Sequence, residues 1–150
     1  MKQNVENMLK EAIEREERFR LEQQEAFKKI FLEATKSIFE ELPALGMIAF
    51  PVYTPVWNDG DECNFTIGEV GFFNEIAAEN LEEIREESFY DVYENEEYVL
   101  DSPESDKMCS LFAEFLNQMS HSIEGIYGTN SIFYILKNGE IIVDDYDCGY

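Results

Sequence analysis

The pattern of hydrophobic and polar positions changes character at Pro43. Residues 1–42 contain no Gly or Pro and are rich in strong helix formers, so they predict one long helix, or two in line, that Pro43 terminates. The second half of this helix is expected to pack on the core, because its apolar residues recur at intervals of three and four. They are Ala26, Phe27, Ile30, Phe31, Ala34, Ile38, Phe39 and Leu42.

The first half of the same helix is much more polar. Glu and Arg residues four apart can hold such a segment as a solvated helix, and the sustained heptads of a long coiled coil are absent. The alternative is that a short apolar patch docks on a second copy or on a partner, through Val5, Leu9, Ala12 and Ile13. We expect residues 1–25 to be an exposed helical extension and residues 26–150 to form a single domain.

Beyond Pro43 the pattern favours strands. Residues 47–73 are expected to form a hairpin, since two β-rich runs, GMIAFPVYTPVW and CNFTIGEVGFF, flank the turn sequence NDGD. Pro51 and Pro55 lack a ladder donor, which predicts that the first strand lies at a sheet edge or is broken by a bulge. NSIFYIL and EIIVDDY predict a second hairpin around an Asn-Gly turn at residues 137–139.

Two helices are expected between the hairpins. The first begins at an Asn74 cap, runs to about Ser88 and turns Ile76, Ala77, Leu81 and Ile84 inward. The second runs from about Asp106 to Glu124 and turns inward Met108, Leu111, Phe112, Phe115, Leu116, Met119 and Ile123. The order predicts an α+β fold with one sheet of about four strands, built from two antiparallel hairpins, and both helices packed on one face.

The charge of the chain is uneven along its length. The net charge is −22; residues 1–42 hold 10 acids and 8 bases, whereas residues 43–150 hold 23 acids and 3 bases. With 45% hydrophobic and 14% aromatic residues, such a chain should nevertheless fold. Nucleic acid phosphates and anionic membranes repel a domain this acidic, whereas basic proteins attract it. We therefore expect a basic protein partner, with no direct contact to nucleic acid or membrane.

The acids are densest between Glu75 and Asp106, where thirteen of them accompany a single base, Arg85. Those on the helix that starts at Asn74 share one broad face and repel one another slightly. This face is either a solvated surface that confers solubility or a docking surface for a basic partner, in its sharpest form a mimic of the DNA backbone. The candidate contacts are Glu75, Glu79, Glu82, Glu83, Glu86, Glu87, Asp91, Glu94, Glu96 and Glu97.

Aromatic residues alternate with acids over residues 89–106. Phe89, Tyr90, Tyr93 and Tyr98 either contact Arg and Lys side chains of a partner or anchor this segment to the core. Oxygen-rich segments elsewhere give a candidate polar site at Asn58, Asp59, Asp61, Asp145 and Asp147. Its segments do not match an EF-hand loop, so we expect neither a metal nor another cofactor.

Few residues suggest an enzyme. The only histidine, His121, has no Ser or Cys motif beside it, and phosphate-binding Gly loops are absent, so a metal-dependent hydrolase using the polar site is the remaining catalytic class. Cys63, Cys109 and Cys148 are too far apart to form a C-x-x-C pair. This wide spacing is typical of reduced thiols in a cytoplasmic protein. The first twenty residues contain no apolar signal segment.

Two short motifs stand out: a Y-T-P-x-x-N-D-G-D-x-C-x-F segment at residues 53–65, and an acidic Tyr-Asp motif at residues 145–147, preceded by Tyr127-Gly128. They resemble motifs of an uncharacterised family of small acidic proteins of bacteria and their phages. The resemblance implies a bacterial or phage setting and no particular reaction. We therefore expect a non-enzymatic, phage-related, cytoplasmic protein that binds a basic protein, such as a host nucleic-acid or defence enzyme that it inhibits. The alternative is a structural protein that self-associates through its N-terminal helix.

Overall fold

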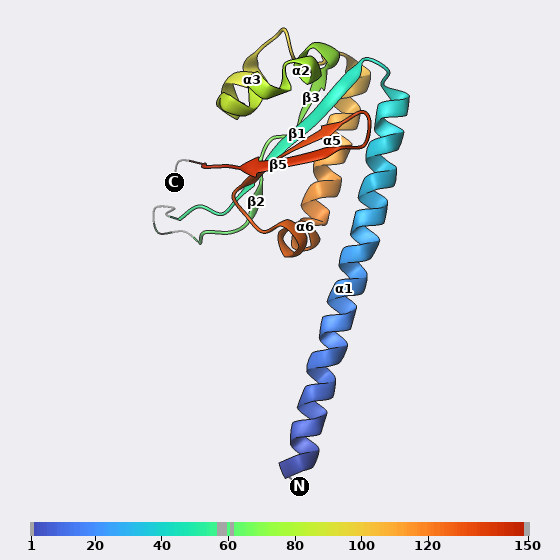
Figure 1. The fold of residues 1–150 in the computed structure, drawn as a ribbon, viewed down its shortest axis with the longest axis vertical. Helices are drawn as coiled ribbons and strands as arrows, with labels where there is room; N and C mark the ends of the chain where they lie inside the picture. Colours follow the sequence, from blue (N-terminus) through green and yellow to red (C-terminus); the bar gives the residue numbers. More distant parts are fainter. Residues whose placement is uncertain (1, 57–59, 61, 149–150) are drawn as a thin grey trace.

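The computed structural model describes residues 2–56, 60 and 62–148, which fold as the expected α+β domain with a long N-terminal helix (Figure 1). In chain order its elements are α1 (Lys2–Glu41), β1 (Leu45–Tyr53), β2 (Thr66–Ile67), β3 (Gly71–Asn74), α2 (Glu75–Glu79), α3 (Leu81–Glu86), α4 (Phe89–Glu94), α5 (Pro103–Gln118), α6 (Ser120–Tyr127), β4 (Ser131–Leu136) and β5 (Ile141–Asp145). In the part of the chain that is described, no helix is both long and apolar enough to cross a membrane.

The strands form one antiparallel sheet in the order β2-β1-β4-β5, with β3 also paired to β1. The first hairpin is interrupted in its second strand. Val52 lies opposite Ile67 of β2, and Ala49 lies opposite Gly71 of β3, so β2 and β3 flank successive parts of the same side of β1. This interruption is why the sheet has five strands where the sequence predicted about four.

Pro51 does not mark a sheet edge, which was one of the two predicted alternatives, because β1 has neighbours on both sides. The other alternative was a bulge, and the pairing of β1 with β3 does shift register between Leu45 and Met47. On one side Pro51 lies opposite Ile132 of β4, and on the other its carbonyl oxygen accepts a hydrogen bond of 2.8 Å from the Gly68 nitrogen. The nitrogen and oxygen of one residue point to the same side of an antiparallel strand. The Pro51 nitrogen therefore faces the gap between β2 and β3, where no ladder donor is needed.

Helices cover both faces of the sheet, which corrects the prediction of one covered face (Figure 1). Ile48 and Phe50 of β1 point to the face that α1, α5 and α6 cover. Met47 and Ala49 point to the opposite face, covered by α2, α3 and α4. The predicted helices were expected to share a face, but the chain crosses from one face to the other between α4 and α5.

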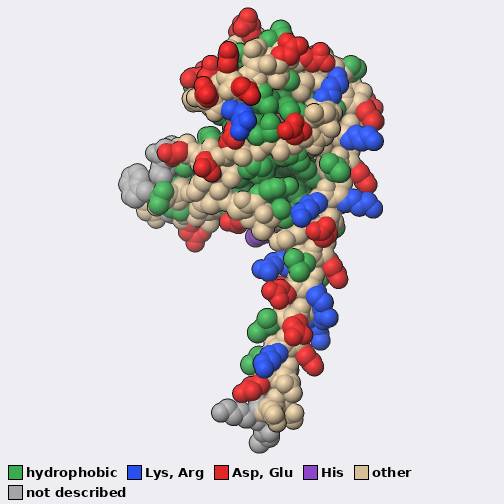
Figure 2. Space-filling model, viewed as in Figure 1, with side chains coloured by type: hydrophobic (Ala, Val, Ile, Leu, Met, Phe, Trp, Pro, Cys, Tyr) green, Lys and Arg blue, Asp and Glu red, His purple; other side chains and the backbone are tan. Residues whose placement is uncertain are grey.

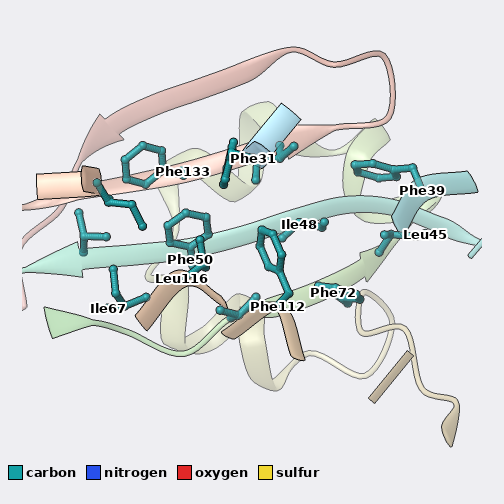
Figure 3. Packing of buried hydrophobic residues seen from close by; sticks show 14 of the residues in the cluster. Phe31, Phe39, Leu45, Ile48, Phe50, Ile67, Phe72, Phe112, Leu116 and Phe133 are labelled. Atoms are coloured by element: carbon teal, nitrogen blue, oxygen red, sulfur yellow. The ribbon is translucent and has the colours of Figure 1, made fainter. Parts of the chain in front are cut away.

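Phenylalanine rings hold α1 and α5 against the sheet (Figure 3). The Phe50 ring stacks on Phe133 with centroids 4.9 Å apart and meets Phe112 of α5 edge-on at 6.4 Å. Phe31 of α1 and Phe72 of β3 also contact Phe112, at 6.0 and 6.3 Å. Because these rings come from five elements spread along the sequence, they fix the second half of α1 in place.

Both helices predicted between the hairpins are divided in two. Asn80 separates α2 from α3, and Met119 separates α5 from α6. The helix α4 lies within residues 89–106, the segment in which aromatic residues alternate with acids. Ile76 and Leu111, both expected to point inward, are 51% and 57% exposed, whereas their neighbours Ala77 and Phe112 are buried.

Candidate functional site

All ten candidate acids are exposed, and they gather over the face of the sheet opposite α1 (Figure 2). We call this region the acidic surface. The sequence predicted that these acids share one continuous helix face. They do not, because the helix is broken at Asn80. They are distributed over α2 (Glu75, Glu79), α3 (Glu82, Glu83, Glu86), and α4 with its flanking turns (Glu87, Asp91, Glu94, Glu96, Glu97).

The start of α2 is fixed by Asn74, the cap that the sequence predicted. The Asn74 Oδ1 accepts a hydrogen bond of 3.1 Å from the Ala77 nitrogen, and its Nδ2 donates one of 2.6 Å to the Glu97 carbonyl oxygen. Gly46 lets the two chain segments approach closely here, since a Cβ on that residue would lie 2.5 Å from the main-chain carbonyl oxygen of Asn74. One side chain thus joins the two ends of the acidic surface.

Arg85 does not neutralise the acids around it. It forms an ion pair with Asp144 of β5, in which Nε and Nη2 donate hydrogen bonds of 2.8 and 2.7 Å to the two carboxylate oxygens. These bonds lower the pKa of Asp144 and raise the pKa of Arg85. At the other end of the surface, Lys137 pairs with Glu75 at 3.2 Å. In the described part of the chain, no ion pair joins Arg85 to a carboxylate of its own helix, α3.

A hollow of about 300 Å³ lies where the acidic surface meets the end of β5. Acidic and tyrosine side chains line this tyrosine hollow, together with Arg85: Glu87, Tyr90, Tyr134, Asp144, Asp145, Tyr146 and Asp147. Tyr134 is only 2% exposed, and it lines the hollow beside Asp144. Burial raises the pKa of Tyr134 to about 12, so at neutral pH the hydroxyl is uncharged and available as a donor or acceptor.

The aromatic residues at the start of the segment 89–106 divide into two groups. Phe89 packs edge-on against Phe73 at 6.3 Å and lies 6.1 Å from Tyr93, so these two residues anchor α4 to the core. Tyr90 is 65% exposed, and its hydroxyl bonds with Glu94, which raises the pKa of the phenol. The anchoring role therefore applies to Phe89 and Tyr93, whereas Tyr90 faces outward at the hollow.

The two motifs behind the family resemblance meet in space. The Tyr53 ring lies 6.0 Å from the Tyr146 ring, and the Thr54 hydroxyl is 2.7 Å from that of Thr129. Of the predicted polar site, the exposed residues Asp145 and Asp147 border the tyrosine hollow. Its other members, Asn58, Asp59 and Asp61, lie outside the described residues.

The remaining titratable candidates do not form a cluster. Among the described residues, no group of three His, Cys, Asp or Glu side chains is arranged to hold a metal ion. The Cys109 thiol donates to the Val70 oxygen at 3.3 Å, and burial raises its pKa to about 11, which suppresses thiolate formation. Cys63 and His121 are exposed.

The residues proposed for self-association lie far from the acidic surface, on the half of α1 that projects from the domain (Figure 1). Every side chain from residue 3 to residue 23 is exposed, and Phe27 is the first buried residue of the helix. Val5, Leu9 and Ile13 are between 55% and 65% exposed, and Ala12 is exposed as well.

Sequence reasoning missed Tyr134 and the partner of Arg85. Strand periodicity places Tyr134 on the same face as Ile132, but it does not reveal that α3 and α4 cover that face. Comparison of the chain with protein-family models, curated protein sequences and solved structures gives no match. The site must therefore be interpreted from its own chemistry.

Proposed function

We propose that this protein is a non-enzymatic interaction protein of the bacterial cytoplasm that binds a basic protein through the acidic surface. The observation that carries the proposal is the tyrosine hollow within that surface, together with the engagement of its only arginine by Asp144. A surface that only keeps the protein soluble needs nothing more than charged side chains. Carboxylates arranged around tyrosine rings provide, in addition, a place for a particular cationic side chain.

An arginine of the partner fits the chemistry of the hollow best. Its planar guanidinium can stack on an exposed ring such as Tyr90 while it donates paired hydrogen bonds to a carboxylate. Glu87 and Asp145 supply carboxylates at the rim, and the uncharged Tyr134 hydroxyl can accept a further hydrogen bond. A lysine would use the charge but not the stacking.

A partner that presents such an arginine within a basic surface is common among proteins that bind nucleic acid, because phosphate contacts require Lys and Arg. With the bacterial or phage setting that the family resemblance implies, the proposed target is a host nucleic-acid or defence enzyme, which the acidic surface would block. The acids follow three short helices and not one straight row. Competition for a DNA-binding groove is thus a narrower version of the proposal, and it is tested separately.

Two variants with equal net charge test the proposal. In the surface variant, Glu82, Glu83, Glu86 and Glu87 become Gln; in the control variant, the same change is made at exposed positions of α1, namely Glu11, Glu14, Glu33 and Glu40. Each protein is immobilised, exposed to bacterial lysate at about 0.05 M salt and eluted with a salt gradient. Mass spectrometry then identifies what each protein retains.

We expect the wild type and the control variant to retain the same basic protein and the surface variant to lose it. Retention by all three proteins alike, or by none, would contradict the proposal. Asp145→Asn combined with Tyr90→Ala should weaken retention as well if an arginine enters the hollow. If the retained protein binds DNA, duplex DNA added in excess should displace it only in the narrower version of the proposal.

A further inference from the structure

The projecting half of α1 carries a regular line of exposed positions. Successive intervals of four and three residues connect Val5, Leu9, Ala12, Glu16, Phe19, Gln23, Ala26 and Ile30. We call this line the seam. Six of its eight residues are apolar, and all eight are exposed. Alternating intervals of three and four are the heptad spacing by which one helix packs along another, so the expectation that sustained heptads are absent does not hold for the exposed side of α1.

The domain of the same chain cannot cover the seam. On a helix of 3.6 residues per turn, the seam lies about 100° around α1 from the face on which Phe27, Phe31 and Phe39 meet the core. It continues from the projecting half into the packed half, where Ile30 remains 46% exposed. An exposed, mainly apolar line about 38 Å long, on a helix that projects from its domain, is typical of a surface that binds another molecule.

We propose that the occupant is a second copy of this chain, packed antiparallel along the seam as a two-fold symmetric dimer. In the proposed register, the two residue numbers of each facing pair of seam residues add up to 35. Leu9 then meets Ala26 of the partner subunit, and Glu16 meets Phe19 of the partner subunit.

The charges beside the seam select this register. Arg15 faces Glu22 of the partner subunit, and the symmetry of the dimer repeats this pair. A shift of one heptad in one direction would place Arg15 opposite the partner's Arg15. A shift in the other direction would place it opposite Lys29 of the partner subunit and bring Glu22 against the partner's Glu22. Both alternatives oppose like charges.

The antiparallel orientation follows from the charge of the domains. Residues 43–150 hold 23 acids and 3 bases, so two parallel chains would bring two strongly negative domains together. A parallel pair would also face Glu16 with the partner's Glu16 within the seam. Antiparallel packing places the domains at opposite ends of the dimer and avoids both repulsions.

Sedimentation of the full-length protein at about 0.15 M salt tests the proposal with a matched pair of variants. Phe19 and Leu21 are 55% and 54% exposed, but only Phe19 lies on the seam. We expect a wild-type dimer, a dissociation constant raised by about tenfold or more in Phe19→Gln, and no change in Leu21→Gln. A monomeric wild type, or equal effects of the two substitutions, would overturn the proposal. Circular dichroism confirms that α1 remains helical, since both positions are solvent-facing in the single chain.

A charge exchange tests the register. Arg15→Glu and Glu22→Arg should each weaken the dimer, because each places like charges opposite one another, and the double variant should restore it. A double variant as weak as the single variants would rule out this register. The result is independent of the acidic surface, so the lysate experiment can succeed or fail without affecting it.

Discussion

Arg85 and Asp144 connect elements that are 59 residues apart in the chain, with α3 on one side and β5 on the other. Their two hydrogen bonds fix the guanidinium in the wall of the tyrosine hollow. The arginine side chain is 40% exposed and that of Asp144 is 25% exposed, so solvent screens the attraction between them. The contribution of this pair is therefore mainly positional: it holds the acidic surface against the end of the sheet.

The ion pair predicts a pH dependence of stability. Hydrogen bonding to Arg85 lowers the pKa of Asp144 in the folded state, so the stabilisation is present above about pH 4 and is lost as the pH falls through the folded-state pKa. Asp144→Asn should lower the melting temperature by about 1–3 °C at pH 7, and the difference should shrink as the pH falls below about 4. Asp145→Asn, which removes an exposed negative charge from the same strand, is the control. A gap between the two variants that stays constant from pH 3 to pH 6 would show that the pair has no such role.

Capping residues decide how firmly the short acidic helices are held. Asn74 caps α2 with its side chain and also donates to Glu97, whereas Ser88 precedes α4 without making a side-chain capping bond. We expect Asn74→Ala to lower the free energy of unfolding by about 1 kcal/mol and Ser88→Ala to change it by less than about 0.5 kcal/mol. Urea denaturation measures both. Equal losses would mean that the cap of α2 has no special role.

Local chemistry made the element types and the second hairpin predictable. Gly139 has a φ of 91°, and the Asn138 side chain accepts a hydrogen bond from the Glu140 nitrogen, as expected for an Asn-Gly turn. The breaks at Asn80 and Met119 could not be predicted, because they fall inside runs whose apolar spacing is helical on both sides. Tertiary contacts, and not residue preference, decide where such helices end.

The sequence of β1 does contain a signal that helices cover both faces of the sheet. Leu45 to Val52 is almost continuously apolar, and its residues are buried without alternation. An antiparallel strand with one solvated face would alternate, so a continuous run indicates that both faces are covered. For the site, the exposure of the acids followed from their charge, but the tyrosine hollow depends on contacts between residues 85–90 and residues 132–147, which are about 40 residues apart or more.

The molecule keeps its two proposed surfaces apart. The acidic surface caps one face of the sheet, while the seam runs along a projecting helix that holds eight of the eleven basic residues (Figure 2). Antiparallel pairing would give an assembly with two acidic surfaces at its ends. A target with two basic sites would then be held more tightly than one with a single site, without any new contact.

The most direct test of the central claim is the salt dependence of the affinity for the protein retained from lysate, measured by calorimetry from about 0.05 to 0.5 M salt. The account predicts a steep fall in affinity for the wild type and for the α1 control variant, and a shallower dependence for the surface variant, which makes fewer charge contacts. An affinity that does not change with salt, or an equal slope for all three proteins, would contradict binding through the acidic surface.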